Sequence, residues 1–167
     1  MILGMSTAAF TKLHVIISLI GILSGLVVVL AMCSGKRMPG WTATFLTTTV
    51  LTSATGFLFH SASFGAPHVV GVLSLVILAI ALVALYVKHL SGAWRWIYIV
   101  TAVLALYLNA FVGVVQAFQK VTFLHALAPT QKEPPFLVAQ VLVLGFFAAI
   151  TLIALKQFPA RTVRAVV

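Results

Sequence analysis

The chain has 167 residues, of which 63% are hydrophobic and only 7% are charged, and this balance excludes a soluble domain of ordinary composition. A single acidic residue, Glu133, stands against ten lysines and arginines. These basic residues lie between and after apolar runs and form no basic face, so they indicate membrane topology signals and no nucleic-acid partner. Cys33 is the only cysteine, which excludes an internal disulfide. The composition predicts an integral membrane protein.

The first apolar run, residues 13–32, is about 20 residues long and therefore long enough to cross a bilayer as a helix. Its residues His14, Ser18, Gly21 and Gly25 recur at helical spacing and share one face. Gly21 and Gly25 form a GxxxG pair, a pattern typical of close helix packing in membranes. We therefore expect His14 to point toward a neighbouring helix.

The second predicted span, residues 41–60, is rich in threonine. Threonine hydroxyls can bond back to the preceding helical turn, which makes them tolerable in lipid. His60 closes this span and shares a face with Gly56 and Thr49. It is therefore predicted to lie, like His14, on a face of small and polar residues.

The last three predicted spans cover residues 68–87, 96–119 and 136–155, and a longer loop of residues 121–135 precedes the final one. His68 opens the third span. The fold class is thus an all-α integral membrane protein, a single compact bundle of five transmembrane helices.

One polar stripe runs along the fourth predicted span. Asn109, Gln116 and Lys120 share a face that becomes more polar toward the end of the span. The stripe has two interpretations: hydrogen bonding between helices, or the wall of a polar cleft that opens to one side of the membrane.

The distribution of basic residues predicts the orientation of the bundle. With five spans, one side carries three basic residues and the other carries seven: Lys36, Arg37, Lys88, Arg95, Lys156, Arg161 and Arg164. Cytoplasmic loops are enriched in lysine and arginine, so the N-terminus is predicted outside and the C-terminus inside. The expected location is a bacterial inner membrane, crossed several times.

Three histidines are predicted to meet on the outer side of the membrane. His14, His60 and His68 each lie at the outer end of a span and on its small-residue face. Neutral imidazole binds haem iron, copper or zinc, so these residues are candidate ligands of a haem or a metal ion. With Asn109 and Gln116 they are also candidates to line a pocket for a quinone or a lipid. The alternative is that histidines at helix ends simply meet the lipid headgroups.

Several enzyme classes are excluded by what the sequence lacks. The chain contains no aspartate, so a Ser-His-Asp triad cannot form, and no predicted span contains a carboxylate for a proton relay. Glycine patterns typical of nucleotide-binding loops are also missing. We therefore expect a protein that is not an enzyme.

The segments GAWRWIYIVTAVLALYLNAFVGVVQAFQK and LAPTQKEPPFLVAQ, residues 92–120 and 127–140, resemble those of small bacterial integral membrane proteins to which no mechanism is attached. The resemblance implies a bacterial origin and nothing about activity. Five spans also invite comparison with the tryptophan-rich translocator proteins. This chain has three tryptophans and lacks their Trp-x-Pro patterns, so we carry over neither porphyrin nor sterol binding.

The sequence therefore favours a membrane protein that binds a small ligand or prosthetic group in an outer-side pocket lined by histidines. Two other functions fit the same residues: an accessory subunit of a larger membrane complex, or a small transporter that acts as a homo-oligomer. The expected partners are the lipid bilayer, a small hydrophobic ligand and other membrane chains. The cofactor, if there is one, is not identified by the sequence beyond haem or a metal ion.

Overall fold

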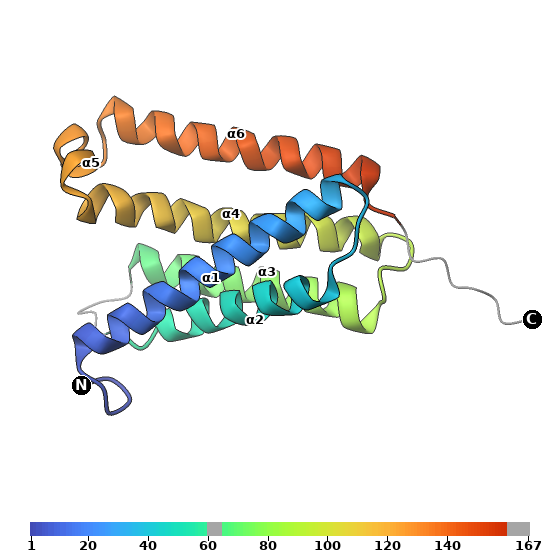
Figure 1. Cartoon of the computed structure of the whole chain (residues 1–167), viewed down its shortest axis with the longest axis horizontal. Helices are drawn as coiled ribbons and strands as arrows, with labels where there is room; N and C mark the ends of the chain where they lie inside the picture. Colours follow the sequence, from blue (N-terminus) through green and yellow to red (C-terminus); the bar gives the residue numbers. More distant parts are fainter. Residues whose placement is uncertain (60–64, 160–167) are drawn as a thin grey trace, which may run out of the picture.

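A computed structural model of the protein describes residues 1–59 and 65–159, and every regular element in these residues is a helix. Five helices are long and run side by side along the longest axis of the molecule (Figure 1). The elements are α1 (Thr7–Cys33), α2 (Pro39–Gly56), α3 (Ala66–Leu82), the π-helical turn η1 (Val83–Val87), α4 (Trp94–Lys120), α5 (Thr122–Leu127) and α6 (Pro134–Gln157).

Consecutive long helices are antiparallel, so the bundle has two distinct ends (Figure 1). We call the end at which α1 begins the N-terminal end; α2 finishes there, α3 begins there, and α5 joins α4 to α6 there. The opposite, C-terminal end holds the turns that join α1 to α2 and η1 to α4. Helix α1 packs on α2, α4 and α6, while α4 also packs on α3. Helices α1 and α4 are thus the central pair of the bundle.

The prediction of an all-helical membrane protein is confirmed. Within the described residues, four helices are long and apolar enough to cross a membrane: Thr7–Cys33, Pro67–Val87, Trp94–Lys120 and Pro134–Gln157. The predicted span 41–60 corresponds to α2, which has 18 residues and is not among the four. Its threonines lower its apolar content.

Helix boundaries differ from the prediction where the sequence supplies a start signal. The Ser6 hydroxyl accepts a bond of 3.2 Å from the Ala9 backbone N–H, so α1 begins at Thr7, before the apolar run. Pro39 and Pro134 each occupy the first turn of their helix, where a missing N–H costs nothing. The predicted loop of residues 121–135 contains the short helix α5.

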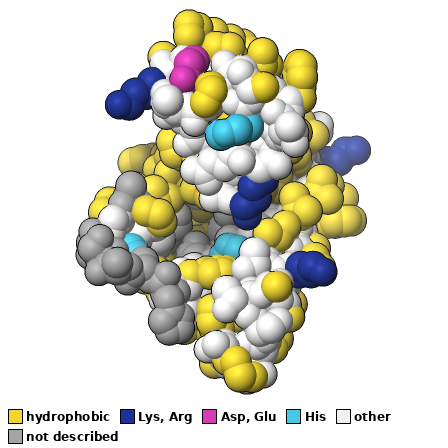
Figure 2. Space-filling model, turned by 90° about the vertical axis from the view of Figure 1, so that its left-hand side faces the viewer, with side chains coloured by type: hydrophobic (Ala, Val, Ile, Leu, Met, Phe, Trp, Pro, Cys, Tyr) yellow, Lys and Arg dark blue, Asp and Glu magenta, His cyan; other side chains and the backbone are white. Residues whose placement is uncertain are grey.

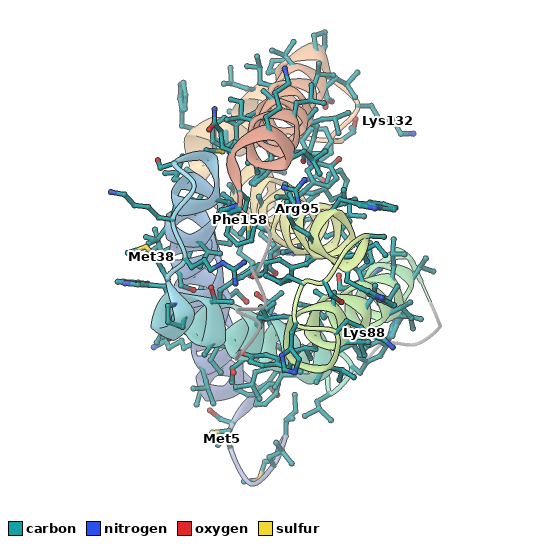
Figure 3. The ribbon with its side chains drawn as sticks, turned by 90° about the vertical axis from the view of Figure 1, so that its right-hand side faces the viewer. Met5, Met38, Lys88, Arg95, Lys132 and Phe158 are labelled. Carbon is teal, nitrogen blue, oxygen red and sulfur yellow. The ribbon has the colours of Figure 1, made fainter. Side chains whose placement is uncertain are left out.

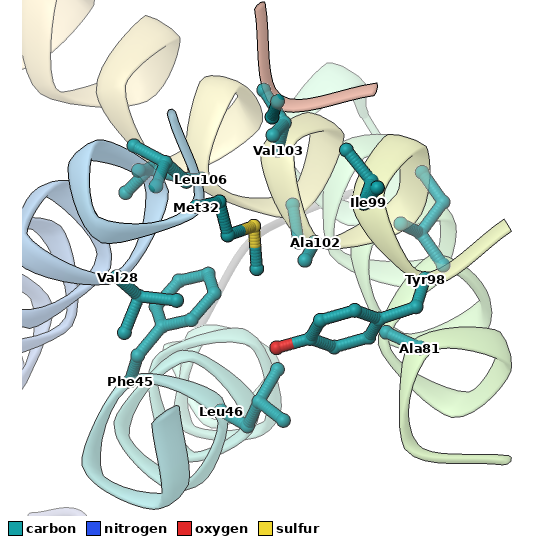
Figure 4. Packing of buried hydrophobic residues seen from close by; sticks show 14 of the residues in the cluster. Val28, Met32, Phe45, Leu46, Ala81, Tyr98, Ile99, Ala102, Val103 and Leu106 are labelled. Carbon is teal, nitrogen blue, oxygen red and sulfur yellow. The ribbon is translucent and has the colours of Figure 1, made fainter. Parts of the chain in front are cut away.

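A layer of large apolar side chains fills the half of the bundle toward its C-terminal end. Val28, Met32, Phe45, Leu106 and Tyr98 are each at most 2% exposed. They come from α1, α2 and α4 and contact one another across the bundle axis (Figure 4). This apolar layer lies between the C-terminal end of the bundle and the polar side chains around Gly21.

Gly25 lies in a close contact between α1 and the side chains of α2 and α4. A Cβ atom on Gly25 would lie 2.6 Å from Leu106 Cδ1 and 2.8 Å from Phe45 Cδ2, both of which belong to buried side chains. These side chains cannot move aside without disturbing the apolar layer. The predicted role of the GxxxG face in close packing is therefore visible in the contacts of α1.

Two arginines hold the C-terminal end of α6. The Arg95 Nη1 atom donates to the backbone oxygens of Leu155, at 3.1 Å, and Phe158, at 2.6 Å. Arg37 donates to the backbone oxygen of Pro159 at 2.9 Å, and its guanidinium lies 5.3 Å from the centre of the Phe158 ring. Arg95 and Phe158 lie close together at this end of the bundle (Figure 3). Cations are favoured there because the last carbonyls of a helix carry partial negative charge.

Replacement of Gly25 by alanine is expected to lower the thermal midpoint of the purified protein in detergent. The added methyl group overpacks a buried contact, which typically costs about 1–3 kcal/mol. Gly145→Ala in α6 is the matched control, because a Cβ there meets nothing within 4 Å. An unchanged midpoint for Gly25→Ala would show that α1 moves away from Phe45 without loss.

Candidate functional site

His14 is held by a hydrogen bond between α1 and α2. Its Nδ1 atom lies 2.8 Å from the hydroxyl oxygen of Thr55, and that hydroxyl lies 2.6 Å from the backbone oxygen of Leu51. A carbonyl oxygen only accepts, so the Thr55 proton points to Leu51 and the hydroxyl accepts from His14. The network assigns the imidazole proton to Nδ1 and leaves the lone pair on Nε2.

The surroundings of the His14 ring are aromatic and small, as its predicted helix face indicates. The Phe59 ring meets the His14 ring edge-on, with 5.1 Å between the ring centres. The Phe10 ring packs on Phe59 as well, also with 5.1 Å between ring centres. A Cβ on Gly56 would lie 4.0 Å from His14 Cε1. His14 therefore lies half-buried at the junction of α1 and the end of α2.

His68 has a structural role at the start of α3. Its Nδ1 atom accepts a 3.2 Å hydrogen bond from the backbone N–H of Gly65, which satisfies a donor at the helix N-terminus. Its ring also lies 6.0 Å from the ring of Phe57. The bond to Gly65 occupies the Nδ1 lone pair and places the ring proton on Nε2, so this tautomer offers no lone pair to a metal.

The predicted convergence of three histidines is only partly described. His60 lies outside the described residues, and His14 and His68 have separate partners on separate helices. Within residues 1–59 and 65–159, no group of three histidine, cysteine or carboxylate side chains is arranged to hold a metal ion. A site that includes His60 therefore stays a prediction.

Three polar side-chain atoms converge on Gly21 in the middle of the bundle. A Cβ at Gly21 would lie 3.2 Å from Thr48 Oγ1 and 3.3 Å from both Thr49 Oγ1 and Asn109 Nδ2. Among the described residues, neither Thr49 Oγ1 nor Asn109 Nδ2 has a hydrogen-bond partner, although both atoms are buried. Such groups usually cost about 1–3 kcal/mol each when unsatisfied, so their presence needs an explanation.

Helix α2 carries two kinds of threonine, a distinction that our sequence analysis missed. Thr44, Thr48 and Thr55 bond to backbone oxygens one turn earlier, as the sequence predicts. Thr49 and Thr52 are buried, and their hydroxyls have no partner in the described part of the chain. The signal was present in the spacing, because the buried face of α2 repeats every three or four residues: Thr42, Phe45, Thr49 and Thr52.

The predicted stripe on α4 runs from this buried cluster to the surface. Asn109 lies partly buried at Gly21, whereas Gln116 is exposed and its Nε2 donates weakly to Gln119 Oε1 at 3.4 Å. Lys120, also exposed, is close enough to act electrostatically on His14. A view of the N-terminal end shows histidine and basic side chains around a hollow between the helices (Figure 2).

We call the region between α1, α2 and α4 the polar cleft, and define it by Asn109, Thr49, Thr52, Thr55 and His14. Its N-terminal end, which we call the mouth, lies at the same end of the bundle as Lys120, the last residue of α4. At the other end, the apolar layer at Gly25 closes it. Two shallow hollows of about 240 and 170 Å³ elsewhere on the described surface are lined mainly by apolar residues, and neither contains a cleft residue.

Thr49→Val is expected to raise the thermal midpoint of ligand-free protein, because it removes a buried, unsatisfied hydroxyl with little change in shape. The gain should not exceed about 1–3 kcal/mol. Thr48→Val is the neighbouring control, since the Thr48 hydroxyl already donates to the Thr44 oxygen at 2.7 Å. A marked fall in the midpoint for Thr49→Val would mean that this hydroxyl has a partner in the purified protein.

Comparison with known proteins supplies no relative from which to transfer a function. No protein-family model, curated protein or solved structure matches this chain.

Proposed function

We propose that the protein crosses a bacterial inner membrane five times, with α2 as the additional span. An 18-residue helix is about 27 Å long, close to the thickness of the hydrocarbon core. Helix α2 packs on both α1 and α3, and the hydroxyls of Thr44, Thr48 and Thr55 are satisfied by its own backbone. These features support a span that is polar in composition but compatible with lipid.

The proposed orientation places the N-terminal end of the bundle outside. Among the described residues, that end carries Lys12, Lys120 and Lys132 beside Glu133, and the opposite end carries Lys36, Arg37, Lys88, Arg95 and Lys156. The excess of basic residues supports a cytoplasmic C-terminal end. The polar cleft would then open to the outside.

Two single-cysteine variants test this topology in a Cys33→Ser background. Ser91 is exposed between η1 and α4, and Ala126 is exposed on α5, so Ser91→Cys and Ala126→Cys report the two ends of the bundle. In intact cells a membrane-impermeant maleimide should label Ala126→Cys only, and after permeabilisation it should label both. The reverse pattern would invert the orientation, and labelling of both in intact cells would contradict a membrane crossing by α4, the long helix between the two positions.

We propose further that the protein is a non-enzymatic binder of a small ligand, which occupies the polar cleft. The unpartnered, buried atoms Thr49 Oγ1 and Asn109 Nδ2 carry this proposal. Both face Gly21, where an added Cβ would lie only 3.3 Å from each of them. A ligand that hydrogen-bonds to these atoms would remove the cost of burying them unsatisfied.

The apolar layer favours binding over transport. Phe45 and Leu106 both pack on Gly25 and are fully buried, so they interrupt the buried polar groups between Thr49 and Thr42, which lies nearer the C-terminal end. A cleft with one mouth suits a ligand that binds and leaves on the same side. A transport function would require these side chains to move.

The tautomer of His14 bears on the haem and metal hypotheses. Histidines that ligate metals usually donate their second ring N–H to another group, as His14 does to Thr55. His68 offers no matching lone pair while it caps α3. The described residues therefore favour a colourless organic ligand over a haem held by two histidines.

The proposal is tested on protein purified in mild detergent, by visible absorption and by mass spectrometry of extracted small molecules. We expect a clear spectrum and a co-purified small molecule in the wild type, and loss of that molecule in Asn109→Leu. Gln157→Ala, at the exposed C-terminal end of α6, should retain it. A haem spectrum would show that the bound group is a haem and would contradict a colourless organic ligand. Retention of the molecule in Asn109→Leu at the wild-type level would show that it binds outside the cleft.

A further inference from the structure

The chemistry of the polar cleft narrows the class of ligand beyond the proposed function. Its unpartnered groups can all donate hydrogen bonds. Asn109 Nδ2 carries two N–H groups, and the hydroxyls of Thr49 and Thr52 do not pass their protons to the preceding turn, unlike that of Thr55. A ligand that meets these groups must therefore bring acceptor atoms.

The described cleft residues offer no negative charge to a cation. Glu133 is the only acidic residue of the chain, and it is engaged at the start of α6. Its Oε1 accepts from the Thr130 hydroxyl at 2.8 Å, and its Oε2 accepts from the Lys132 backbone N–H at 3.0 Å. Desolvation acts to raise the pKa of Glu133, but these hydrogen bonds outweigh it and lower the pKa, so the carboxylate stays ionised in its own network.

The formal charge at the end of the bundle where the mouth lies is mainly positive, with Lys12, Lys120 and Lys132 against Glu133 among the described residues. Lys120 ends α4 beside the mouth and acts electrostatically on His14. A cation at the mouth attracts anions and repels cations, and inside the membrane this effect is screened less than in water. The positive charge of Lys120 and the hydrogen-bond donors of the cleft therefore both favour a ligand with acceptor atoms over a cation.

We propose that the ligand presents an exposed acceptor oxygen, which binds between the Asn109 amide and the Thr49 hydroxyl; this inference rests on the proposed ligand-binding function. Two kinds of compound share that chemistry, a carboxylate and a quinone carbonyl. They differ in charge, so Lys120 distinguishes them. The affinity for a carboxylate should depend on Lys120 and fall as the salt concentration rises. The affinity for a neutral quinone should be insensitive to both.

Three probes test the proposal on the full-length protein in detergent, each titrated by shift of the thermal midpoint: benzoate, benzylamine and ubiquinone-1. Benzoate and benzylamine match in size and differ in charge. We expect benzoate or ubiquinone-1 to bind and benzylamine not to bind. Thr49→Val and Asn109→Leu should each lower the affinity for the probe about tenfold, which is the effect expected from one or two lost hydrogen bonds.

Thr44→Val is the matched control, because the Thr44 hydroxyl is exposed and bonds to the Gly40 oxygen. Lys120→Gln should weaken benzoate and abolish its salt dependence, and it should leave ubiquinone-1 unchanged. Circular dichroism checks that the variants remain folded, and Thr52→Val provides a second nearly isosteric change within the cleft.

Two outcomes overturn the acceptor-oxygen assignment and leave ligand binding intact: benzylamine binding that Thr49→Val weakens, or a co-purified molecule that lacks an acceptor oxygen. If neither Thr49→Val nor Asn109→Leu alters probe binding, the probe binds outside the cleft. Failure of all three probes, in protein that carries no co-purified molecule, would overturn the proposed function as well.

Discussion

The close approach of α1 to α2 and α4 is the contact on which the rest of the bundle depends. Lipid tails are as apolar as leucine, so helices in a membrane gain little from apolar burial and associate through tight packing and hydrogen bonds. Gly25 lets the side chains of Phe45 and Leu106 approach α1 closely, and Gly21, one turn earlier, lets Thr49 and Asn109 do the same. One face of α1 therefore contacts apolar side chains at Gly25 and polar side chains at Gly21.

That arrangement sets the chemistry of the cleft through the backbone of α2. Where a threonine hydroxyl bonds to the preceding turn, its remaining lone pair can accept, as Thr55 accepts from His14. Where it does not, as at Thr49, the hydroxyl keeps its proton for another group. One helix thus presents an acceptor near the mouth and donors deeper inside, and the difference arises from which face each threonine occupies.

Sequence reasoning predicted the helices, their approximate limits and the inward face of α1, because apolar length and residue spacing determine those features. It placed Asn109 on a polar stripe and Gly21 at a helix contact, but it could not pair them, since the angle and register between α1 and α4 depend on the packing of all neighbours. His68 illustrates the same limit. Its position at a helix start was readable, whereas its bond to the Gly65 backbone depends on the turn before α3. The separation of the α2 threonines into bonded and unpartnered groups likewise required atomic contacts.

The arginines at the C-terminal end have a consequence for the order in which the molecule is assembled. Arg37 and Arg95 are synthesised long before the carbonyl groups of Leu155, Phe158 and Pro159 that they finally bind. Until α6 emerges from the ribosome, both guanidinium groups must be satisfied by water and lipid phosphates at the membrane surface. The arrival of the last helix exchanges those temporary partners for backbone oxygens. Lysine at position 37 would keep the charge during insertion but would lose the planar guanidinium that lies over the Phe158 ring.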